Sequence, residues 1–240
     1  MNEPDIHDSE YVRDLFDRVS NTYGYTNYLA SFGFTERWRK KCVSKLDQLQ
    51  SDACGYDLMC GRGETWVNLL SHHPTIKKLT GLDISPEMIK GARIQGDKLS
   101  PNKFNFMEAD VFKNDISSKS ADFIVSTFGI KTFTIEQQQL LAIEVNRILK
   151  PGGIFSFVEV SHPKGWIFSR LYMFYLTKVM PVIEKLFLGY SYGYSAIGLY
   201  VTEFGNCEYF SSELESHGLQ VEYKKLFFGC ATAVSGIKPK

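Results

Sequence analysis

The sequence has few cysteines and no excess of charge of either sign. Its five cysteines are odd in number and form no C-x-x-C pair, which argues against a disulfide framework and against a cysteine-based metal site. Lys and Arg (27) balance Asp and Glu (27), which argues against a broad surface for a polyanion. We therefore expect neither a metal ion nor a nucleic-acid partner.

Long apolar runs and internal repeats are also missing. No run reaches the ~18 residues that a membrane span needs, and the polar, acidic start over Met1–Glu10 does not resemble a secretory signal. With 240 residues and 44% hydrophobic residues, the chain is long enough to bury a stable core without disulfide bonds or bound metal ions. These features predict a globular, cytoplasmic protein.

Four zones of a single domain follow one another along the chain. Residues 1–50 predict a helical cap, in which Ser20–Phe34 reads as an irregular loop and Thr35 as the N-cap of a second helix. Residues 51–160 predict a ligand-binding core. Residues 161–206 form an aromatic-rich insert, and residues 207–240 predict a short helix and a hairpin.

The core zone alternates short apolar runs with helical stretches, a pattern typical of βαβ units with a parallel sheet. The predicted strands are Gly55–Met59, Lys78–Leu82, Phe104–Glu108, Ala121–Ser126 and Ile154–Val160. The predicted helices are Glu64–Ser71, Pro86–Gln95 and Ile135–Leu149. The C-terminal zone adds a helix over Ser211–His217 and strands over Gln220–Phe228 and Cys230–Ile237.

A glycine-rich turn follows the first predicted strand. Gly61 and Gly63 allow a ligand to approach the backbone and meet free N–H groups, although a tight turn without a ligand is the alternative. A dinucleotide fingerprint would need a small residue where Trp66 stands, and no Lys-Ser/Thr pair marks a phosphate loop. Both nucleotide readings of the turn therefore lose support.

Carboxylates follow the next two strands. Asp83 ends the second strand, where it can accept both hydroxyl protons of a ribose or merely serve the N-terminus of the helix that Ser85-Pro86 begins. Asp110 follows the third strand, where it suits an adenine amino group with Val111 against the base, unless it is a solvated loop residue. The segment 126–131 should border the reacting centre at the same edge of the sheet.

The order D-x-x-x-G-x-G, G-L-D-I-S-P-E-M, E-A-D-V, F-G-I-K and L-K-P-G-G resembles class I S-adenosylmethionine-dependent methyltransferases. More narrowly, it is similar to the ubiquinone/menaquinone biosynthesis C-methyltransferase family. This resemblance implies an α/β fold with a Rossmann-like, doubly wound seven-stranded sheet and a reversed C-terminal hairpin. N-terminal helices and a helical aromatic lid insert would accompany the sheet.

The resemblance also implies a set of contacts with S-adenosylmethionine (SAM). These contacts are Tyr23, Asp57, Met59, Gly61, Arg62, Gly63, Asp83, Ile84, Met88, Asp110, Val111 and Thr127. The chain departs from the family pattern at Met59, at Arg62, at Lys131-Thr132 and over Tyr192–Thr202. The last two departures fall in the presumed acceptor region, so they leave the reaction type standing and the acceptor open.

The implied reaction transfers a methyl group to a small, aromatic or quinone-like acceptor, at carbon. Carbon methylation of a ring needs a phenolate and a group that removes the ring proton. The candidates are His162, Lys131, Tyr192 and Tyr194, each of which can instead be a loop or packing residue. Methylation at oxygen or nitrogen and a non-catalytic SAM-binding module are the alternatives. The aromatic insert forms either a lid or a packing or homodimer face.

Overall fold

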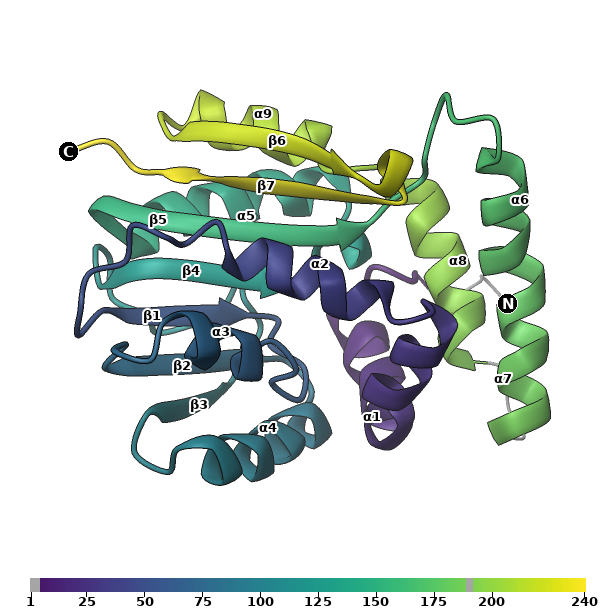
Figure 1. The fold of residues 1–240 in the computed structure, drawn as a ribbon, viewed down its shortest axis with the longest axis horizontal. Helices are drawn as coiled ribbons and strands as arrows, with labels where there is room; N and C mark the ends of the chain where they lie inside the picture. The colour runs from purple at the N-terminus through teal and green to yellow at the C-terminus, as the bar shows by residue number, and fades with distance from the viewer. Residues whose placement is uncertain (1–4, 189–191) are drawn as a thin grey trace.

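The protein is built around a seven-stranded sheet. In the computed structural model, which describes residues 5–188 and 192–240, the strand order is β3-β2-β1-β4-β5-β7-β6. The first five strands are parallel, and β7 runs antiparallel to both β5 and β6 (Figure 1). The strands are β1 (Cys54–Leu58), β2 (Lys78–Asp83), β3 (Phe104–Glu108), β4 (Ala121–Thr127), β5 (Leu149–Val160), β6 (Gln220–Leu226) and β7 (Ala231–Ile237). The predicted Rossmann-like sheet with a reversed final hairpin is confirmed.

Helices flank the sheet and gather at one end of it. The helical elements are α1 (Ser9–Ala30), α2 (Phe34–Val43), α3 (Trp66–His72), α4 (Pro86–Leu99), η1 (Ile130–Thr132), α5 (Ile135–Ile148), α6 (Ser169–Phe174), η2 (Tyr175–Val179), α7 (Met180–Leu188), α8 (Tyr192–Phe204), α9 (Glu208–Ser216) and η3 (Phe227–Gly229). Capping signals set several of these boundaries. Ser85 caps α4 by accepting from the Met88 N–H at 3.0 Å, and Thr134 and Gln137 form a capping box on α5.

Two apolar cores lie on the two faces of the sheet. One packs α2, α3 and α4 on the sheet, with Cys42, Trp66 and Leu69 fully buried. The other packs α5 and α9, with Leu141 and Phe210 fully buried. Both cores join strands from most of the sheet, so the carboxyl ends of the parallel strands are held in fixed positions.

The helices α1, α6, α7 and α8 stand at the edge where the parallel strands end (Figure 1). Helix α1 contacts α2, α4 and α8, and η2 contacts α6, α7 and α8. In open parallel sheets this edge is where ligands bind. The fold therefore places the N-terminal zone and the insert 161–206 next to the predicted site. The role of the insert as a lid stays a prediction.

The prediction of an irregular loop over Ser20–Phe34 is wrong. Helix α1 continues to Ala30 in spite of a segment rich in Gly, Asn and Tyr, because tertiary contacts override weak helix propensity. The Asp17 carboxylate anchors this helix by accepting from the Ser85 hydroxyl and, at 3.3 Å, from the Glu87 N–H. Helix α1 is thereby tied to the beginning of α4.

The predicted N-cap of α2 is also wrong. Gly33, with φ of 76°, occupies the N-cap position, and the Thr35 hydroxyl instead lies 2.9 Å from the Ser31 hydroxyl. A left-handed residue is needed there because the chain reverses between α1 and α2, and glycine adopts that conformation without strain.

Trp66 stands where a small residue would be needed in a dinucleotide site, and it packs well here. Its ring stacks on Phe104 at 4.6 Å between centroids, and its N–H donates to Asp57 at 2.8 Å. Gly63 and Gly81 make room for it, since a Cβ at either position would come within 2.7 Å of the indole ring. Gly63, in the turn after β1, and Gly81, in β2, therefore leave the space that the Trp66 side chain occupies.

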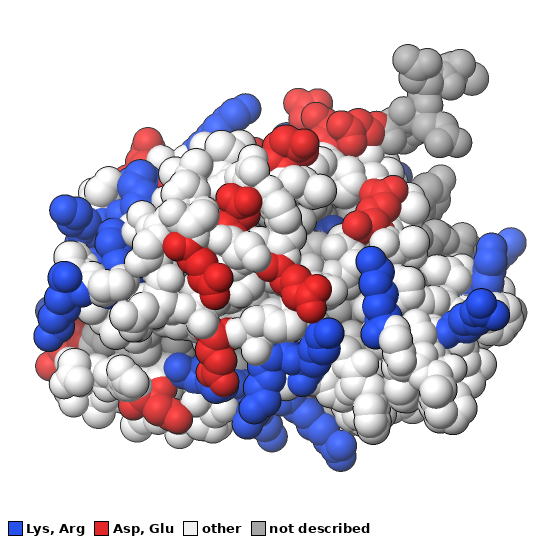
Figure 2. Space-filling view, turned by 90° about the horizontal axis from the view of Figure 1, so that it is seen from above, with Lys and Arg blue, Asp and Glu red and all other residues white. Residues whose placement is uncertain are grey.

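Within the described residues, no helix is long and apolar enough to cross a membrane. Side chains of both signs lie on the face seen from above, as expected for a net charge of zero (Figure 2). No group of His, Cys, Asp and Glu among the described residues is arranged to hold a metal ion.

Candidate functional site

A cleft lies at the carboxyl ends of β1, β2, β3 and β4 and holds most of the predicted cofactor residues. The predicted residues that line it are Met59, Gly61, Asp83, Ile84, Met88, Asp110, Val111 and Thr127. It encloses about 760 Å³, its open mouth included. Residues at the ends of four strands are thus brought together, as a nucleoside site in this kind of sheet requires.

Asp83 is the central carboxylate of the cleft. It is buried, its Oδ2 accepts from the Gly61 N–H at 2.8 Å, and its Oδ1 accepts from the Ser85 N–H at 3.0 Å. Each oxygen keeps a second lone pair, so the carboxylate can still accept two hydroxyl protons. Burial raises the pKa of Asp83 to about 6, although the Ser85 and Gly61 N–H groups oppose this shift.

The turn after β1 is held in an unusual backbone conformation. Met59 and Gly61 both have positive φ, of 56° in each case. Met59, which departs from the family pattern, fits because Gly129 lies against it: a Cβ at position 129 would come 2.6 Å from the Met59 Cβ. The turn after β1 and the turn after β4 therefore pack closely against each other.

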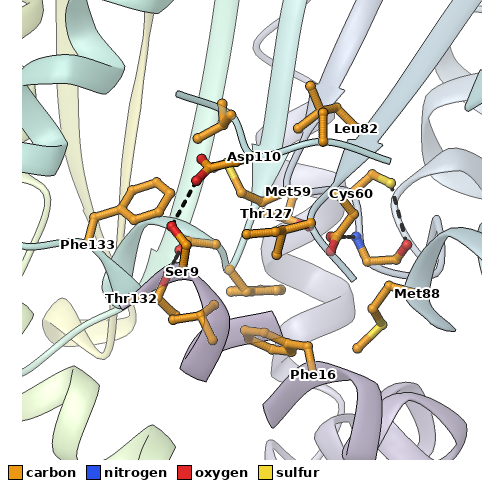
Figure 3. Close-up of a pocket in the computed structure, with 18 of the residues that line it drawn as sticks. Ser9, Phe16, Met59, Cys60, Leu82, Met88, Asp110, Thr127, Thr132 and Phe133 are labelled. Carbon is orange, nitrogen blue, oxygen red and sulfur yellow. Dashed lines mark hydrogen bonds between the residues drawn. The ribbon is translucent and has the colours of Figure 1, made fainter. Parts of the chain in front are cut away.

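Helix α1 closes the cleft on the side opposite the sheet. The Ser9 hydroxyl donates to the Asp110 Oδ2 at 2.8 Å, while Val12 and Phe16 add an apolar wall (Figure 3). The other Asp110 oxygen accepts from the Phe112 N–H at 2.9 Å. Asp110 therefore ties the cover to the loop after β3, a role that the sequence did not predict.

Two charged residues in the cleft were missed by the sequence analysis. The Glu64 Oε1 is buried without a hydrogen-bond partner among the described residues, as is the Arg39 Nε. The Arg39 guanidinium lies 5.1 Å from the centre of the Phe128 ring and 3.8 Å from a Glu36 oxygen. Glu64 directly follows the glycine turn, a position that could have indicated it, whereas nothing in the sequence near Arg39 points to the cleft.

Three predicted cofactor residues lie outside the lining of this cleft. Asp57 is buried beneath it and accepts from Trp66, and burial raises its pKa to about 8. The Arg62 side chain lies on α4, where it packs against Gly91. Gly63, with φ of 79°, provides the bend over Trp66. Asp57 and Gly63 thus support the turn, and any cofactor contact by Arg62 would come from its main chain.

A second cavity adjoins the first. It is mainly apolar, encloses about 1020 Å³ with its mouth, and is lined by aromatic residues of α2, α6, η2 and η3 and of the turns before α2 and after β4. The aromatic residues are Phe32, Phe34, Trp38, Phe128, Tyr172, Tyr175 and Phe227. Phe128 lines both cavities. Its φ of 68° is unusual for a residue with a side chain, and such strain is typical of functional turns.

A buried ion pair lies at the wall of the second cavity. The Lys131 Nζ is 3.3 Å from the Glu159 Oε1, and the two side chains are 3% and 0% exposed. Lys131 also donates to the Phe128 carbonyl, so two of its three N–H donors have partners among the described residues. Burial raises the pKa of Glu159, and the Lys131 charge opposes that shift. Lys131 is also one of the residues that line the cavity.

Among the other predicted catalytic residues, only His162 has a side chain in the described part of the structure, and it lies elsewhere. His162 lines neither cavity, its main-chain N–H donates to the Gly205 carbonyl at 2.6 Å, and burial together with Lys164 lowers its pKa. The side chains of Tyr23, Tyr192 and Tyr194 lie outside the described part of the structure, although their backbones belong to α1 and α8. Their predicted roles stay predictions.

Comparison with known proteins places the chain in a family. Residues 5–238 match the ubiE/COQ5 methyltransferase family. The chain belongs to this family. It is 29% identical over 231 residues to the ubiquinone/menaquinone biosynthesis C-methyltransferase UbiE of Geotalea daltonii, a match that covers 95% of this chain and 97% of the relative. It is 29% identical over 222 residues to the demethylmenaquinone methyltransferase of Chlorobaculum tepidum, covering 90% and 88%.

Solved structures share the fold of this ubiE/COQ5 family member. The human N-acetylserotonin methyltransferase in complex with SAM superposes with a TM-score of 0.61 at 19% identity, over 94% of this chain and 59% of the human one. A putative methyltransferase of Haloferax volcanii gives 0.63 at 19% identity, over 94% and 98%. The protein is a SAM-dependent methyltransferase, as the motif order predicted.

The residues present in the cleft fit SAM. Asp83 suits the ribose hydroxyls, and Ile84, Met88 and Val111 provide an apolar slot for a base. The orphaned Glu64 oxygen suits the ammonium group at the amino-acid end of the cofactor. The ribose, the base and this ammonium group therefore each have a residue of matching chemistry in the cleft.

The pKa of Asp83 makes cofactor affinity depend on pH. Ribose hydroxyls donate to the ionised carboxylate, so we expect SAM affinity to fall as the pH drops through about 6, by about tenfold for each further unit. The free protein holds the Asp83 proton more tightly than the unfolded chain, whose carboxyl has the ordinary pKa of 3.8. Its free energy of unfolding should therefore fall as the pH rises between these values. Calorimetric titration of SAM between pH 5 and 8 measures the effect, and an affinity that stays constant down to pH 5 would contradict it.

Proposed function

We propose that the protein methylates a ring carbon of a small, quinone-like aromatic acceptor in its reduced form. The main support is the turn at Phe128, which lines both the cleft that suits SAM and the aromatic cavity that contains Lys131. A donor in one cavity and a planar ring in the other would meet across this turn. The names of the relatives from Geotalea daltonii and Chlorobaculum tepidum support a quinone-like acceptor and transfer to carbon.

Bound SAM supplies a methyl group that its sulfonium already makes electrophilic. The protein then has to position the acceptor in line and exclude water. Asp83 would orient the nucleoside from the sheet side, and Val12 and Phe16 of α1 would keep water away from the opposite side. Trp38 and Tyr172 would hold the acceptor ring between aromatic walls.

Lys131 would stabilise the negative oxygen of the acceptor. A phenolate pushes electron density to the ring carbon, and an ammonium beside its oxygen keeps it ionised. Glu159 and the Phe128 carbonyl hold the Lys131 ammonium at the wall of the cavity. After transfer the ring proton must leave, and Tyr192 and Tyr194 of α8 are the candidates within the insert for its acceptor. His162 lines neither cavity, so it has less support.

The sequence also predicts a possible homodimer and a cytoplasmic location, and both stay hypotheses. Static light scattering of the full chain measures the first directly. Fractionation of the source cells measures the second.

The product of the reaction tests the proposal. The protein should convert a prenylated naphthohydroquinone with a free ring carbon and SAM labelled with carbon-13 in its methyl group. We expect one equivalent of S-adenosylhomocysteine for each methylated ring, with the labelled methyl bonded to carbon in the NMR spectrum of the product. A methyl on oxygen, or no turnover although SAM binds, would overturn the assignment of the acceptor.

A further inference from the structure

The rod formed by α6, η2 and α7 exposes a row of apolar side chains. Ile167, Leu171, Phe174 and Val182 are all exposed, Ile167 to 84%. Leu171 and Phe174, three residues apart, share one face of α6, while Ile167 lies two residues before that helix and Val182 lies on α7, beyond η2. The rod stands at the outer edge of the molecule in Figure 1, with α8 on its inner side. Apolar rows of this length on a protein surface mark an interaction site.

Basic side chains accompany this row. Lys164, Arg170, Lys178 and Lys185 are exposed, and none of them forms an ion pair with another described residue. The only acidic residue between positions 161 and 188 is Glu184, which is buried. From above, the end of the molecule that carries α6 has a broad uncharged surface with Lys and Arg at its margin (Figure 2). The face is thus apolar and positively charged at once.

The row continues to the mouth of the aromatic cavity. Trp166 stacks on the exposed Phe228 with 5.3 Å between ring centroids, and Phe227 packs beside both. On the other side, Phe32, which is 80% exposed, lies 6.0 Å from the Tyr175 ring. Phe32, Tyr175 and Phe227 all line the cavity. A partner that docks on the apolar row would therefore also cover the mouth of the aromatic cavity.

We propose that this face, Ile167 to Lys185 with Phe32, Phe227 and Phe228, docks on the surface of a membrane that contains anionic lipids. Exposed aliphatic and aromatic side chains beside Lys and Arg are the combination that inserts into the boundary between headgroups and acyl chains. A second copy of the chain fits less well. A two-fold interface would set Arg170, Lys178 and Lys185 against the same charges of the partner.

Docking would connect the cavity with the lipid phase. The inference rests on the proposed function in one respect: a prenylated acceptor dissolves in the bilayer and has to reach the cavity from there. With the mouth of the cavity on the docked face, the acceptor ring could enter while its apolar tail stays among the acyl chains. The cleft that suits SAM lies beneath α1 instead, and none of the residues of the proposed face lines it.

Vesicle sedimentation with the full chain tests the docking. We expect binding to phosphatidylcholine vesicles that contain phosphatidylglycerol, weaker binding at high salt, and at least about tenfold weaker binding without the anionic lipid. The pair Lys178→Gln and Lys185→Gln should bind the anionic vesicles about thirtyfold more weakly, at the strength usual for two basic residues.

Substitutions in the apolar row provide the sharper comparison. The pair Ile167→Glu and Leu171→Glu should abolish binding. The matched control is Ile94→Glu with Ile143→Glu, on α4 and α5, which are 49% and 47% exposed and add the same charge elsewhere. The control should bind within twofold of the parent protein.

Three results would overturn the docking proposal: a parent protein that binds neither kind of vesicle, a control pair that loses as much binding as the row pair, or a dimer that the row pair converts to a monomer. Turnover of an acceptor without a long tail should be unchanged in the row pair and in the control pair. That measurement separates a failure of docking from a failure of the proposed reaction.

Discussion

We expect Lys131→Met to lower turnover by about 10²–10³-fold while the affinity for SAM changes little. Lys131 lines the aromatic cavity, and its replacement takes away the charge that would stabilise a phenolate oxygen. The cleft that suits SAM does not include this side chain. Steady-state kinetics with the reduced quinone and calorimetry with SAM measure the two quantities separately.

The same substitution should destabilise the protein by about 3–5 kcal/mol, because it leaves the buried Glu159 carboxylate without its partner. Burial already raises the pKa of Glu159, and the loss of the Lys131 charge should raise it further. Urea denaturation measures the loss. The double variant Lys131→Met with Glu159→Gln should regain most of the stability, since no isolated charge is left in the core.

Comparison of the single and double variants separates a role in the reaction from a role in folding. If Lys131 acts on the acceptor, the double variant is stable and still turns over slowly. Lys131→Arg, which keeps the charge, should retain much more activity than Lys131→Met. A double variant that regains turnover along with stability would show that the ion pair only supports the fold.

The second large effect is expected at Asp83. Asp83→Asn should weaken SAM binding by about 100-fold, because an amide offers one acceptor oxygen instead of two and carries no charge. The amide can still accept from one of the two N–H groups, of Gly61 and Ser85, that hold the carboxylate now. Calorimetric titration measures the loss, with circular dichroism as a check of folding.

Asp97→Asn is the matched control for this substitution. Asp97 lies on the exposed side of α4, the helix that begins directly after Asp83. The control makes the same chemical change and should leave SAM affinity as it is. An Asp83→Asn variant that binds SAM as tightly as the Asp97→Asn control would show that Asp83 does not bind the ribose.

The sheet and the cofactor cleft could be predicted because local signals mark them. Apolar runs, turn residues and caps such as Ser85-Pro86 lie next to one another in the sequence, and the carboxyl ends of parallel strands meet at one edge of the sheet. Asp83, Asp110 and Thr127 therefore appear in the cleft as predicted.

The remaining features depend on contacts between distant segments. The continuation of α1 beyond Ser20 is stabilised by packing and by the hydrogen bond from Ser85, the N-cap of α4, to Asp17. The weak local helix propensity of the segment does not reveal these contacts. Arg39 reaches the cleft from α2, and Glu159 pairs with a lysine 28 positions earlier. A sequence shows neither which helix covers a site nor which buried charges meet.

A structure of the protein with S-adenosylhomocysteine and a prenylated naphthohydroquinone tests the central claim most directly. We predict that the nucleoside lies on Asp83 and the ring in the aromatic cavity, with its oxygen beside Lys131. The free ring carbon should lie ~3–3.5 Å from the position of the transferable methyl carbon, across the turn at Phe128. A ring bound outside this cavity, or a sulfur turned away from Phe128, would contradict the account.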